Sequence, residues 1–393
     1  MADMPAVANR VDADARAGIR APRVLHFVTG GFSGATQVAI DLVEAHRASG
    51  NFDAKLVLRR KRNTESGRVE ALRQKGLDVE VVAGWSHAVT IWQLARICRR
   101  FCPDILVAHG FSDHLWGRYA GLLAKVPHMI HVEHNSRERY SRCRLSQALW
   151  LSKCTDAIVG CSEGVRSSLL ARGFPAEKTM AIPNGIRLVP YQGPVPELAA
   201  RIPGIVMAAR FARQKDHETL LRALALLRDR GLRPTLQFAG GGKMRYKHAA
   251  QELCNQLGLQ EQVNFIGFCS DVPALLMQHR ICVLATHYEG MPLSLIEGMA
   301  AGCAVVGSQV VGVQEVIDHR YNGLLAEHAS PSSLADALED LLRDDVGAQR
   351  MADAARRDAI GHYSMERMTS DYESLFATIM SGRPSQETRA GRE

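Results

Sequence analysis

Two glutamates and two basic residues in the second half of the sequence have types and spacings suited to binding a sugar and a diphosphate. Glu289 and Glu297 are eight residues apart, which is a little over two helical turns, so both lie near one face of a helix. A carboxylate accepts hydrogen bonds from two neighbouring hydroxyls, as in ribose or a hexose. Arg210 and Lys215 follow a predicted strand at 205–208, and such cations bind diphosphate oxygens.

The segment between the two glutamates predicts a second feature, an anion site made of backbone N–H groups. Pro292 is expected at the first helical position, where a missing N–H is tolerated. The N–H groups near Met291 and Leu293 then point beyond the carboxyl edge of a sheet, as in a pyrophosphate site. Taken singly, these features have plain structural alternatives: a capped helix with a solvent-facing glutamate, and a basic surface loop.

Glycines follow predicted strands at two turns where a ligand could approach the backbone. Gly240 and Gly241 follow a strand at 235–238, and Gly34 lies in the turn after a strand at 24–28. Glycine has no Cβ and permits close contact. Neither turn contains G-x-G-x-x-G or the P-loop pattern, which disfavours a nicotinamide-binding protein and a P-loop ATPase.

One histidine is also a candidate, because His134 closes a strand and could orient or polarise a substrate hydroxyl. His128 and His131 belong to the same region, and spacing alone does not choose among the three. The nine cysteines are scattered and no zinc motif is present, which indicates reduced thiols in a cytoplasm and no metal site. A D-x-D pair, Asp12 and Asp14, falls in a predicted disordered extension and is rejected as a metal site.

The 393-residue chain is 46% hydrophobic and 23% charged, which is the composition of a globular protein. The elements that position the candidate residues alternate between short apolar runs and helical segments in both halves of the chain. This alternation predicts parallel βαβ units. The predicted fold class is therefore α/β, with two tandem Rossmann-like domains facing a central cleft. The expected strands are at 24–28, 55–58, 79–82, 105–108, 129–132 and 157–159, and then at 205–208, 235–238, 263–266, 281–284 and 304–306.

Domain boundaries follow from composition, because prolines and a glycine crowd the segment between residues 190 and 203. We expect a helix at the end of the second domain that could cross back to the first. The predicted divisions are a disordered extension at 1–22, a first domain at 23–190, a linker at 191–203, a second domain at 204–363, a helix at 364–380 and a disordered tail at 381–393.

Charge is divided unevenly between the halves. Residues 1–190 hold 27 Lys and Arg against 17 Asp and Glu, whereas residues 191–393 hold 21 against 24. No window approaches 18 consecutive apolar residues, and the N-terminus lacks a signal-peptide pattern, so neither a membrane-spanning helix nor secretion is predicted.

Taken together, these motifs resemble the retaining glycosyltransferases of family 4, which have the GT-B fold. The resemblance covers roughly residues 23–379. It rests on the E-x7-E pair at Glu289 and Glu297, on Arg210 and Lys215, and on the segments 34–36, 161–163, 183–185, 239–242 and 265–267. The sequence departs from the family pattern in having Ala35, Ala209 and Arg187, which bears on donor and acceptor contacts rather than on the class.

The resemblance implies a metal-independent enzyme that moves a sugar from a nucleotide-diphosphate sugar to a hydroxyl acceptor, with no other cofactor. It implies that Glu297 binds the ribose and that Glu289 holds hydroxyls of the transferred sugar. Arg210, Lys215 and the N–H groups near 291–293 would stabilise the leaving diphosphate. Gly34, Gly240 and Gly241 would let the backbone approach the donor, and His134 would contact the sugar.

The excess of positive charge in the first half suggests where the acceptor lies. A basic run at 59–62 follows a strand, and a second basic group is interleaved with apolar and aromatic side chains. We hypothesise a cytoplasmic enzyme that lies peripherally on the anionic inner face of the cytoplasmic membrane and uses a glycan or lipid-linked acceptor, such as a lipopolysaccharide precursor. A generic solvated basic face is the alternative, and no motif supports nucleic-acid binding. The second group comprises Arg137, Arg139, Arg142 and Arg144 among Tyr140, Leu145, Leu149 and Trp150.

Two other functions remain open on these residues. A nucleotide-sugar epimerase on a similar scaffold would convert the donor without an acceptor, and a non-catalytic protein would only bind it. The presence of both cations and both glutamates favours the transferase. The sequence does not specify the base, the sugar, the acceptor or the oligomeric state.

Overall fold

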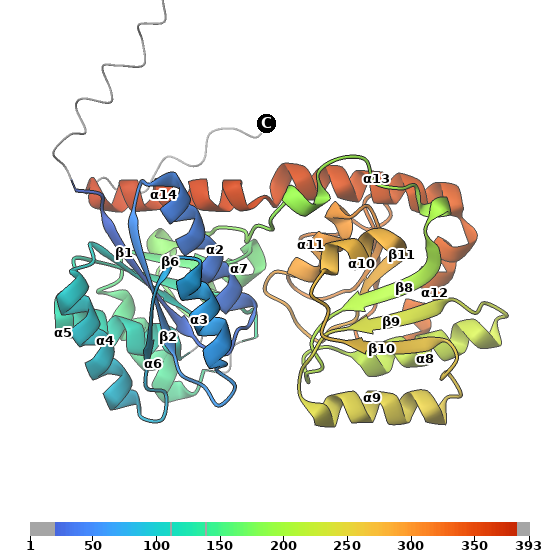
Figure 1. The fold of residues 1–393 in the computed structure, drawn as a ribbon, viewed down its shortest axis with the longest axis horizontal. Helices are drawn as coiled ribbons and strands as arrows, with labels where there is room; N and C mark the ends of the chain where they lie inside the picture. Colours follow the sequence, from blue (N-terminus) through green and yellow to red (C-terminus); the bar gives the residue numbers. More distant parts are fainter. Residues whose placement is uncertain (1–19, 111, 138–139, 383–393) are drawn as a thin grey trace, which may run out of the picture.

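The chain forms two α/β domains, each built on one parallel β-sheet (Figure 1). The computed structural model describes residues 20–110, 112–137 and 140–382. The first sheet has seven strands in the order β3-β2-β1-β4-β5-β6-β7, and the second has six in the order β10-β9-β8-β11-β12-β13. Both orders reverse direction beside the first strand, as in Rossmann-like folds, so the predicted α/β class with two such domains is confirmed.

The elements of the first domain are β1 (Arg23–Thr29), α2 (Gly34–Ser49), β2 (Asp53–Arg59), α3 (Ser66–Gln74), β3 (Asp78–Val82), α4 (His87–Phe101), β4 (Ile105–His109), α5 (Asp113–Ala124), β5 (His128–Glu133), α6 (Arg142–Ser152), β6 (Ala157–Gly160), α7 (Glu163–Leu170), the 3-10 turn η1 (Ala176–Lys178) and β7 (Thr179–Ala181).

The elements that follow are the 3-10 turns η2 (Val189–Tyr191) and η3 (Leu198–Ala200), then β8 (Ile202–Ala208), α8 (His217–Asp229), β9 (Thr235–Ala239), α9 (Met244–Gln256), β10 (Val263–Gly267), α10 (Val272–Gln278), β11 (His279–Leu284), α11 (Leu293–Ala300), β12 (Ala304–Ser308), β13 (Leu324–Ala326), α12 (Pro331–Arg343), α13 (Asp345–His362) and α14 (Met365–Met380).

Side-chain alternation divides the first sheet into two differently packed faces. On one face, Leu25 and Leu106 pack in a core with residues of α4, α5 and α6. On the other, Val24 and Val107 pack in a core with α2 and with Phe376 of α14. Successive residues of one strand therefore meet different helices, and this decides which polar side chains can reach each other.

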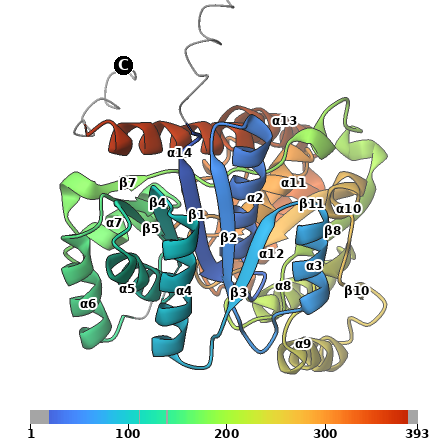
Figure 2. The same cartoon turned by 60° about the vertical axis from the view of Figure 1, so that its left-hand side comes forward.

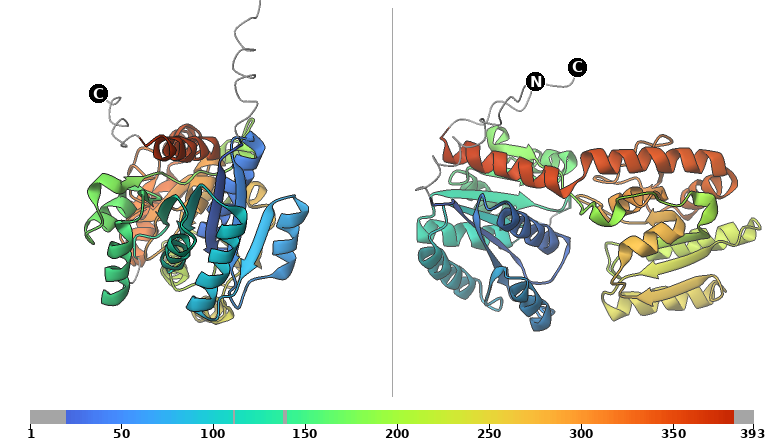
Figure 3. Two further views of the ribbon diagram at one scale, coloured as in Figure 1. Left: turned by 90° about the vertical axis from the view of Figure 1, so that its left-hand side faces the viewer. Right: turned by 45° about the horizontal axis from the view of Figure 1, so that its top comes forward.

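The last helix belongs to the first domain although it follows the second in sequence. Tyr372 and Phe376 of α14 are fully buried against the first sheet, and α14 lies beside α2 in Figure 2. Figure 3 shows α13 over the second domain continuing in line into α14 over the first. At the crossing, the carbonyl of Tyr363 accepts a hydrogen bond from the N–H of Ile186 at 2.8 Å.

The proline-rich segment is fixed to α13. The guanidinium of Arg356 donates to the carbonyls of Tyr191 and Gly193 at 2.8 and 2.9 Å. The N–H of Leu198 donates to the side-chain oxygen of Gln349 at 2.8 Å. The connection between the domains is thus tied to the helix that carries the chain back.

The predicted strands coincide with observed ones to within three residues at each end, because continuous apolar runs mark fully buried parallel strands. Two short edge strands, β7 and β13, and the short helix α3 were not predicted, since none carries a long periodic apolar pattern.

Of the extension expected at 1–22, residues 1–19 lie outside the described residues, as do Asp12 and Asp14. Arg20 already pairs with Asp104 at 2.9 Å. Residues 383–393 of the predicted tail also lie outside the described residues.

Candidate active site

The predicted site residues gather at the carboxyl ends of the parallel strands, where the strand order reverses in each sheet. Arg210 follows β8, Gly240 follows β9, and Glu289 follows β11. From the first domain, Gly34 follows β1 and His134 follows β5. This edge is where open α/β sheets bind ligands.

Lys215 and Glu289 form an ion pair between Nζ and Oε1. Their side chains are only 13% and 8% exposed, and the hydroxyl of Thr286 donates to the same carboxylate oxygen at 2.9 Å. A paired, hydrogen-bonded carboxylate is oriented within a little-hydrated region. The sequence placed these two residues in one site and did not predict that they pair.

The two loops that carry this ion pair are bound to each other along their length. The side-chain amide of Gln214 donates to the carbonyl of Tyr288 at 2.7 Å. The carbonyl of Gln214 in turn accepts from the N–H of His287 at 2.9 Å. Lys215 and Glu289 are therefore held as one unit, whereas Arg210 is exposed at the start of its loop.

The glycine loop after β9 supports the loop that begins with Arg210. Gly240 has φ of +151°, and a Cβ there would lie 2.2 Å from the carbonyl oxygen of Ala209. A side chain at this position is therefore excluded by the neighbouring backbone. A Cβ at Gly241, in contrast, meets nothing within 4 Å, so Gly241 borders open space.

Helix α11 begins one residue later than predicted. Pro292 is the N-cap rather than the first helical residue, and Leu293 is the first. Proline offers no side chain that could cap the first-turn N–H groups, and no side-chain cap is formed. The expectation of a free N–H group at Leu293 is wrong, because this N–H donates to the carbonyl of Met291 at 3.1 Å and Pro292 has no N–H. The uncapped start of α11 is still a partly positive helix end suited to an anion.

Glu297 lies within α11 in an environment that disfavours its charge. Burial, and then the nearby carboxylate of Asp41, raise the pKa of Glu297 to about 7. Asp41 belongs to α2 of the first domain, so the two domains bring carboxylates near each other. Arg187 pairs with Asp41 at 2.6 Å, which gives a structural role to a residue that departs from the family pattern.

His134 lies where the first domain contacts the loop of Glu289. A Cβ at Gly290 would lie 2.2 Å from the carbonyl oxygen of His134. The hydroxyl of Ser136 donates to the carbonyl of Glu289 at 2.5 Å. Burial lowers the pKa of His134 to about 4, so the ring is neutral near pH 7. Gly290 and Ser136 were missed by the sequence analysis, because neither role is visible until two distant segments meet.

Strand alternation separates the three histidines that spacing left open. His131 is fully buried on the face of the sheet covered by α5. His128 is at the opposite end of β5, with Nδ1 3.4 Å from Asp156. His134 is the one of the three that adjoins the second domain.

Gly34 is the first residue of α2, beside the carboxyl end of β1. A Cβ at Gly34 meets nothing within 4 Å, so the backbone here borders open space. Its approach to a ligand stays a prediction. Ser33 precedes it as the N-cap.

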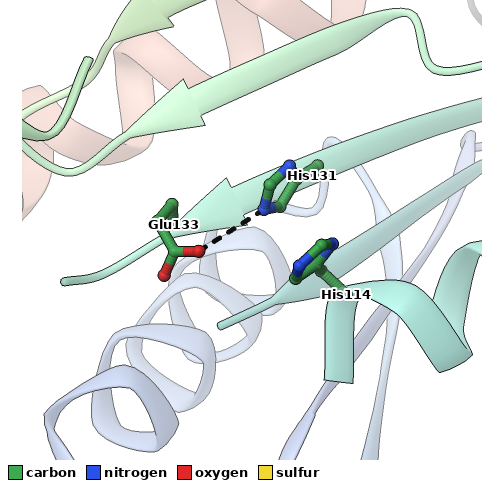
Figure 4. A group of neighbouring side chains, drawn as sticks. All are labelled: His114, His131 and Glu133. Atoms are coloured by element: carbon green, nitrogen blue, oxygen red, sulfur yellow. Dashed lines mark ion pairs between the residues drawn. The ribbon is translucent and has the colours of Figure 1, made fainter. Parts of the chain in front are cut away.

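A buried polar cluster not predicted from the sequence lies on the α5 face of the first sheet (Figure 4). Glu133 and two histidines, His114 and His131, each place a potential ligand atom within 4.8 Å of the others. Arg118 donates to Nδ1 of His114 at 2.7 Å, because a guanidinium only donates. Nε2 of a neutral His114 then carries hydrogen and has no lone pair for a metal.

With its hydrogen on Nε2, His114 takes part in a chain of hydrogen bonds that leads to His134. Nε2 of His114 is 2.9 Å from the hydroxyl of Tyr140, and that hydroxyl is 3.4 Å from Glu133. Glu133 in turn accepts from the N–H of His134 at 3.0 Å. These residues fit a hydrogen-bonded support for the His134 segment better than they fit a metal centre.

Part of the basic character predicted for the surface of the first domain is buried instead. Arg59 is 4% exposed and pairs with Asp113 of α5, and Tyr140 is turned inward to His114. Arg139 lies outside the described residues. Arg142 remains exposed on α6. Two exposed tryptophans lie on helices of the same domain, Trp92 on α4 and Trp150 on α6.

A further contact between the domains was also missed. The carboxylate of Glu315 accepts hydrogen bonds from the N–H groups of Glu163 and Gly164 at 2.8 and 2.6 Å. These N–H groups form the start of α7, where a helix end favours negative charge. Glu315 thus holds the second domain against the first.

Family models match both domains of the chain. Residues 32–189 match the model described as Glycosyltransferase Family 4, and residues 199–358 match that described as Glycosyl transferases group 1. The chain belongs to the family 4 glycosyltransferases.

Relatives in sequence include several glycosyltransferases. An uncharacterized glycosyltransferase of Methanocaldococcus jannaschii is 30% identical over 45% of this chain and 45% of its own. The Escherichia coli UDP-Gal:alpha-D-GlcNAc-diphosphoundecaprenol alpha-1,3-galactosyltransferase is 22% identical over 73% of this chain and 78% of its own. The matched region spans less than half the length of the first relatives, between 34% and 45%.

Solved structures show that the fold is GT-B. HepE of Anabaena, in complex with UDP and glucose, is 19% identical, has a TM-score of 0.79, and covers 91% of this chain and 100% of its own. The lipopolysaccharide outer core galactosyltransferase WaaB is 16% identical, with a TM-score of 0.66 and coverage of 91% and 99%. The predicted GT-B architecture is confirmed.

Proposed function

We propose that this chain is a glycosyltransferase that moves a sugar from a UDP-sugar to a hydroxyl acceptor with retention of anomeric configuration. The observation that carries the proposal is the junction of Lys215, Glu289 and the start of α11, which has no side-chain cap, with the His134 segment of the other domain. Cations and helix N–H groups bind a diphosphate there, and the carboxylate and the imidazole offer partners for sugar hydroxyls.

Retention is proposed from the absence of a suitable protein base beside the predicted sugar position. Among the described residues there, Glu289 is already paired with Lys215 and His134 has a pKa of about 4. A donor phosphate oxygen would therefore take the acceptor proton as the acceptor oxygen bonds to the anomeric carbon and the bond to the diphosphate breaks. The proton and the departing charge then both reside on the leaving nucleotide.

We further propose that the reaction needs no divalent metal. Arg210, Lys215 and the start of α11 would neutralise the negative charge of the leaving diphosphate, as a metal would otherwise do. Turnover should persist in a chelating buffer such as EDTA, after the protein has been dialysed against it. A loss of turnover that added Mg²⁺ or Mn²⁺ restores would contradict this part of the proposal.

The acceptor is proposed to be a glycan or lipid-linked glycan of the cell envelope. Several relatives are named for such substrates, including the E. coli galactosyltransferase above and the Rhizobium meliloti lipopolysaccharide core biosynthesis glycosyltransferase LpsE, 24% identical over 73% of this chain and 79% of its own. No described helix is long and apolar enough to cross a membrane. The exposed tryptophans and arginine of α4 and α6 would instead contact an anionic membrane surface.

A donor panel tests the function. Purified protein is incubated with UDP-, GDP- and ADP-sugars, with and without a bacterial lipid extract, and released nucleotide and sugar products are followed. The proposal predicts UDP release that depends on the extract. Conversion of the donor to an isomeric nucleotide sugar without extract would favour an epimerase, and binding without any conversion would favour a non-catalytic protein.

A further inference from the structure

Three histidine rings form a hydrogen-bonded row across the first sheet and end at the candidate active site. Nδ1 of His26 on β1 lies 3.0 Å from Nε2 of His109 at the end of β4. Nδ1 of His109 lies 3.0 Å from Nε2 of His134, after β5. The three strands are neighbours in the sheet. The row therefore crosses β1, β4 and β5 on the face covered by α2 and α14.

Each ring in the row is neutral. His26 and His109 are fully buried, and burial, followed by the neighbouring imidazoles, lowers the pKa of both well below the usual value. Burial likewise lowers the pKa of His134. A neutral imidazole has one N–H and one lone pair, so each ring both donates and accepts through its two nitrogens.

The tautomers of the three rings are consequently coupled. If Nε2 of His134 carries hydrogen, it donates to His109, and His109 donates through its own Nε2 to His26. If each ring carries its hydrogen on the other nitrogen, all the hydrogen bonds run the opposite way, and Nδ1 of His134 carries the hydrogen instead. Nδ1 of His134 is buried and has no hydrogen-bond partner within the described part of the chain. It therefore presents a lone pair in the first state and an N–H in the second.

A carboxylate at the far end favours the first state. Nδ1 of His46 on α2 is 3.3 Å from Oε1 of Glu373 on α14, and Asn51 also donates to this carboxylate at 3.0 Å. A carboxylate only accepts, so His46 carries its hydrogen on Nδ1 and has a lone pair on Nε2. The ring centroids of His46 and His26 are 5.6 Å apart, and Nε2 of each ring is buried with no hydrogen-bond partner among the described residues. Hydrogen on Nε2 of His26 places a donor beside the lone pair of His46, whereas the opposite tautomer leaves two lone pairs there, so the first state is favoured.

We propose that His26, His109 and Glu373 are positioning residues that hold His134 in the Nε2–H tautomer, so that its Nδ1 accepts a hydrogen bond from a hydroxyl of the transferred sugar. No proton is transferred along the row, which acts only through tautomer and ring orientation. The role in turnover rests on the proposed function. It also gives α14, the helix that crosses between the domains, a direct link to the site.

Nitrogen NMR tests the tautomer without any turnover. In protein labelled with ¹⁵N-histidine, long-range ¹H–¹⁵N correlations distinguish Nδ1–H from Nε2–H rings, and the His134→Asn variant assigns the signal. We expect His134 as the Nε2–H tautomer. In Glu373→Gln, whose amide can donate to His46, we expect the Nδ1–H form of His134 to appear. Asp371→Asn removes a charge from the same helix without a contact to His46 and should leave the tautomer unchanged.

Two NMR results would overturn the proposal. The first is an Nδ1–H tautomer of His134 in the unaltered protein. The second is a His134 signal that responds equally to Glu373→Gln and Asp371→Asn. Neither result depends on whether the donor or acceptor has been identified, so failure of the tautomer assignment is distinguishable from failure of the proposed glycosyl transfer.

Kinetics tests the consequence once a donor is known. His109→Phe removes the partner of His134, and we expect kcat to fall about tenfold, the scale of one hydrogen bond, with a smaller change in the KM for the donor. His109→Asn keeps an oxygen able to accept from Nε2 of His134 and should recover most of kcat. Equal losses in both variants, or a loss confined to thermal stability, would contradict the positioning role.

Discussion

The two domains share a strand order but differ in where their polar groups lie. In the first domain, strand residues themselves are buried and polar, among them His26, His109, His131 and Glu133. In the second, the strand interiors are mostly apolar, and Arg210, Lys215 and Glu289 lie in the loops that follow the strands. The second domain therefore carries its polar groups on loops, whereas the first holds the half-buried segment that begins at His134 in place through a buried network.

The largest expected effect concerns two basic residues of the second domain that we predict to face a ligand, compared with an exposed arginine of the same loop. Lys215→Ala and Arg210→Ala should each lower kcat by about 10²–10³, the scale of removing one preorganised charge stabiliser. Arg213→Ala changes an exposed residue of the same loop and serves as the control. Initial rates of nucleotide release, with circular dichroism to check folding, provide the measurement. Near-normal turnover by a folded Lys215→Ala protein would show that the ion pair does not serve the reaction.

The buried network of the first domain is tested by stability. Arg118 is fully buried, so Arg118→Met should lower the free energy of unfolding by about 3 kcal/mol, because it leaves buried polar partners unpaired. All four tryptophans, at positions 85, 92, 116 and 150, lie in the first domain, so urea unfolding followed by tryptophan fluorescence reports on this domain.

The control for this experiment lies in the second domain. Arg222→Ala removes an exposed pair with Glu218 on α8 and should change stability by less than about 1 kcal/mol. A loss of similar size in both variants would contradict the contrast between the two domains.

The pH dependence of donor affinity tests the raised pKa of Glu297. The resemblance implies that the carboxylate of Glu297 accepts hydrogen bonds from ribose hydroxyls. On that hypothesis, affinity should be nearly constant above pH 7 and fall up to about tenfold per unit as pH drops below the pKa of about 7. A UDP-sugar titrated by calorimetry is suitable, since its diphosphate is a diester and does not titrate in this range. Asp41→Asn removes a neighbouring charge and should move the inflection to lower pH, and Glu297→Gln should abolish it. An unchanged inflection in Glu297→Gln would assign it to another group.

The smallest expected effect concerns the outer surface of the first domain. Arg142→Ala should weaken binding to vesicles that contain anionic lipid by about fivefold, since a basic residue near such a surface contributes about 1 kcal/mol. Flotation with anionic and with neutral vesicles gives the comparison, and Arg222→Ala of the second domain is the matched control. Equal flotation of both variants, or no flotation of the unaltered protein, would contradict a membrane-facing first domain.

The contrast between domains also explains what the sequence could predict. Loop motifs that follow strands are local, so the spacing of Glu289 and Glu297 and the position of Arg210 were readable directly. The pairing of Lys215 with Glu289 was not, because it depends on β8 and β11 being neighbours. The start of α11 was misplaced by one residue, since proline is acceptable both as N-cap and as first helical residue.

The histidine row was the least predictable feature. Its members are separated by more than twenty residues in sequence and meet only because β1, β4 and β5 are adjacent and in register. The sequence did contain one usable signal: a polar residue within an apolar strand is normally hydrogen-bonded. His26 and His109 met that condition, and seeking a common partner for them would have pointed to His134.

The most direct test of the central claim follows a UDP-sugar in the presence of lipid extract by ¹H and ³¹P NMR, with the unaltered protein and Lys215→Ala in parallel. We predict UDP release together with a new glycosidic signal of the same anomeric configuration as the donor, and neither change with Lys215→Ala. An isomerised nucleotide sugar, or an unaltered donor with every sugar that binds, would contradict the assignment of this chain as a glycosyltransferase.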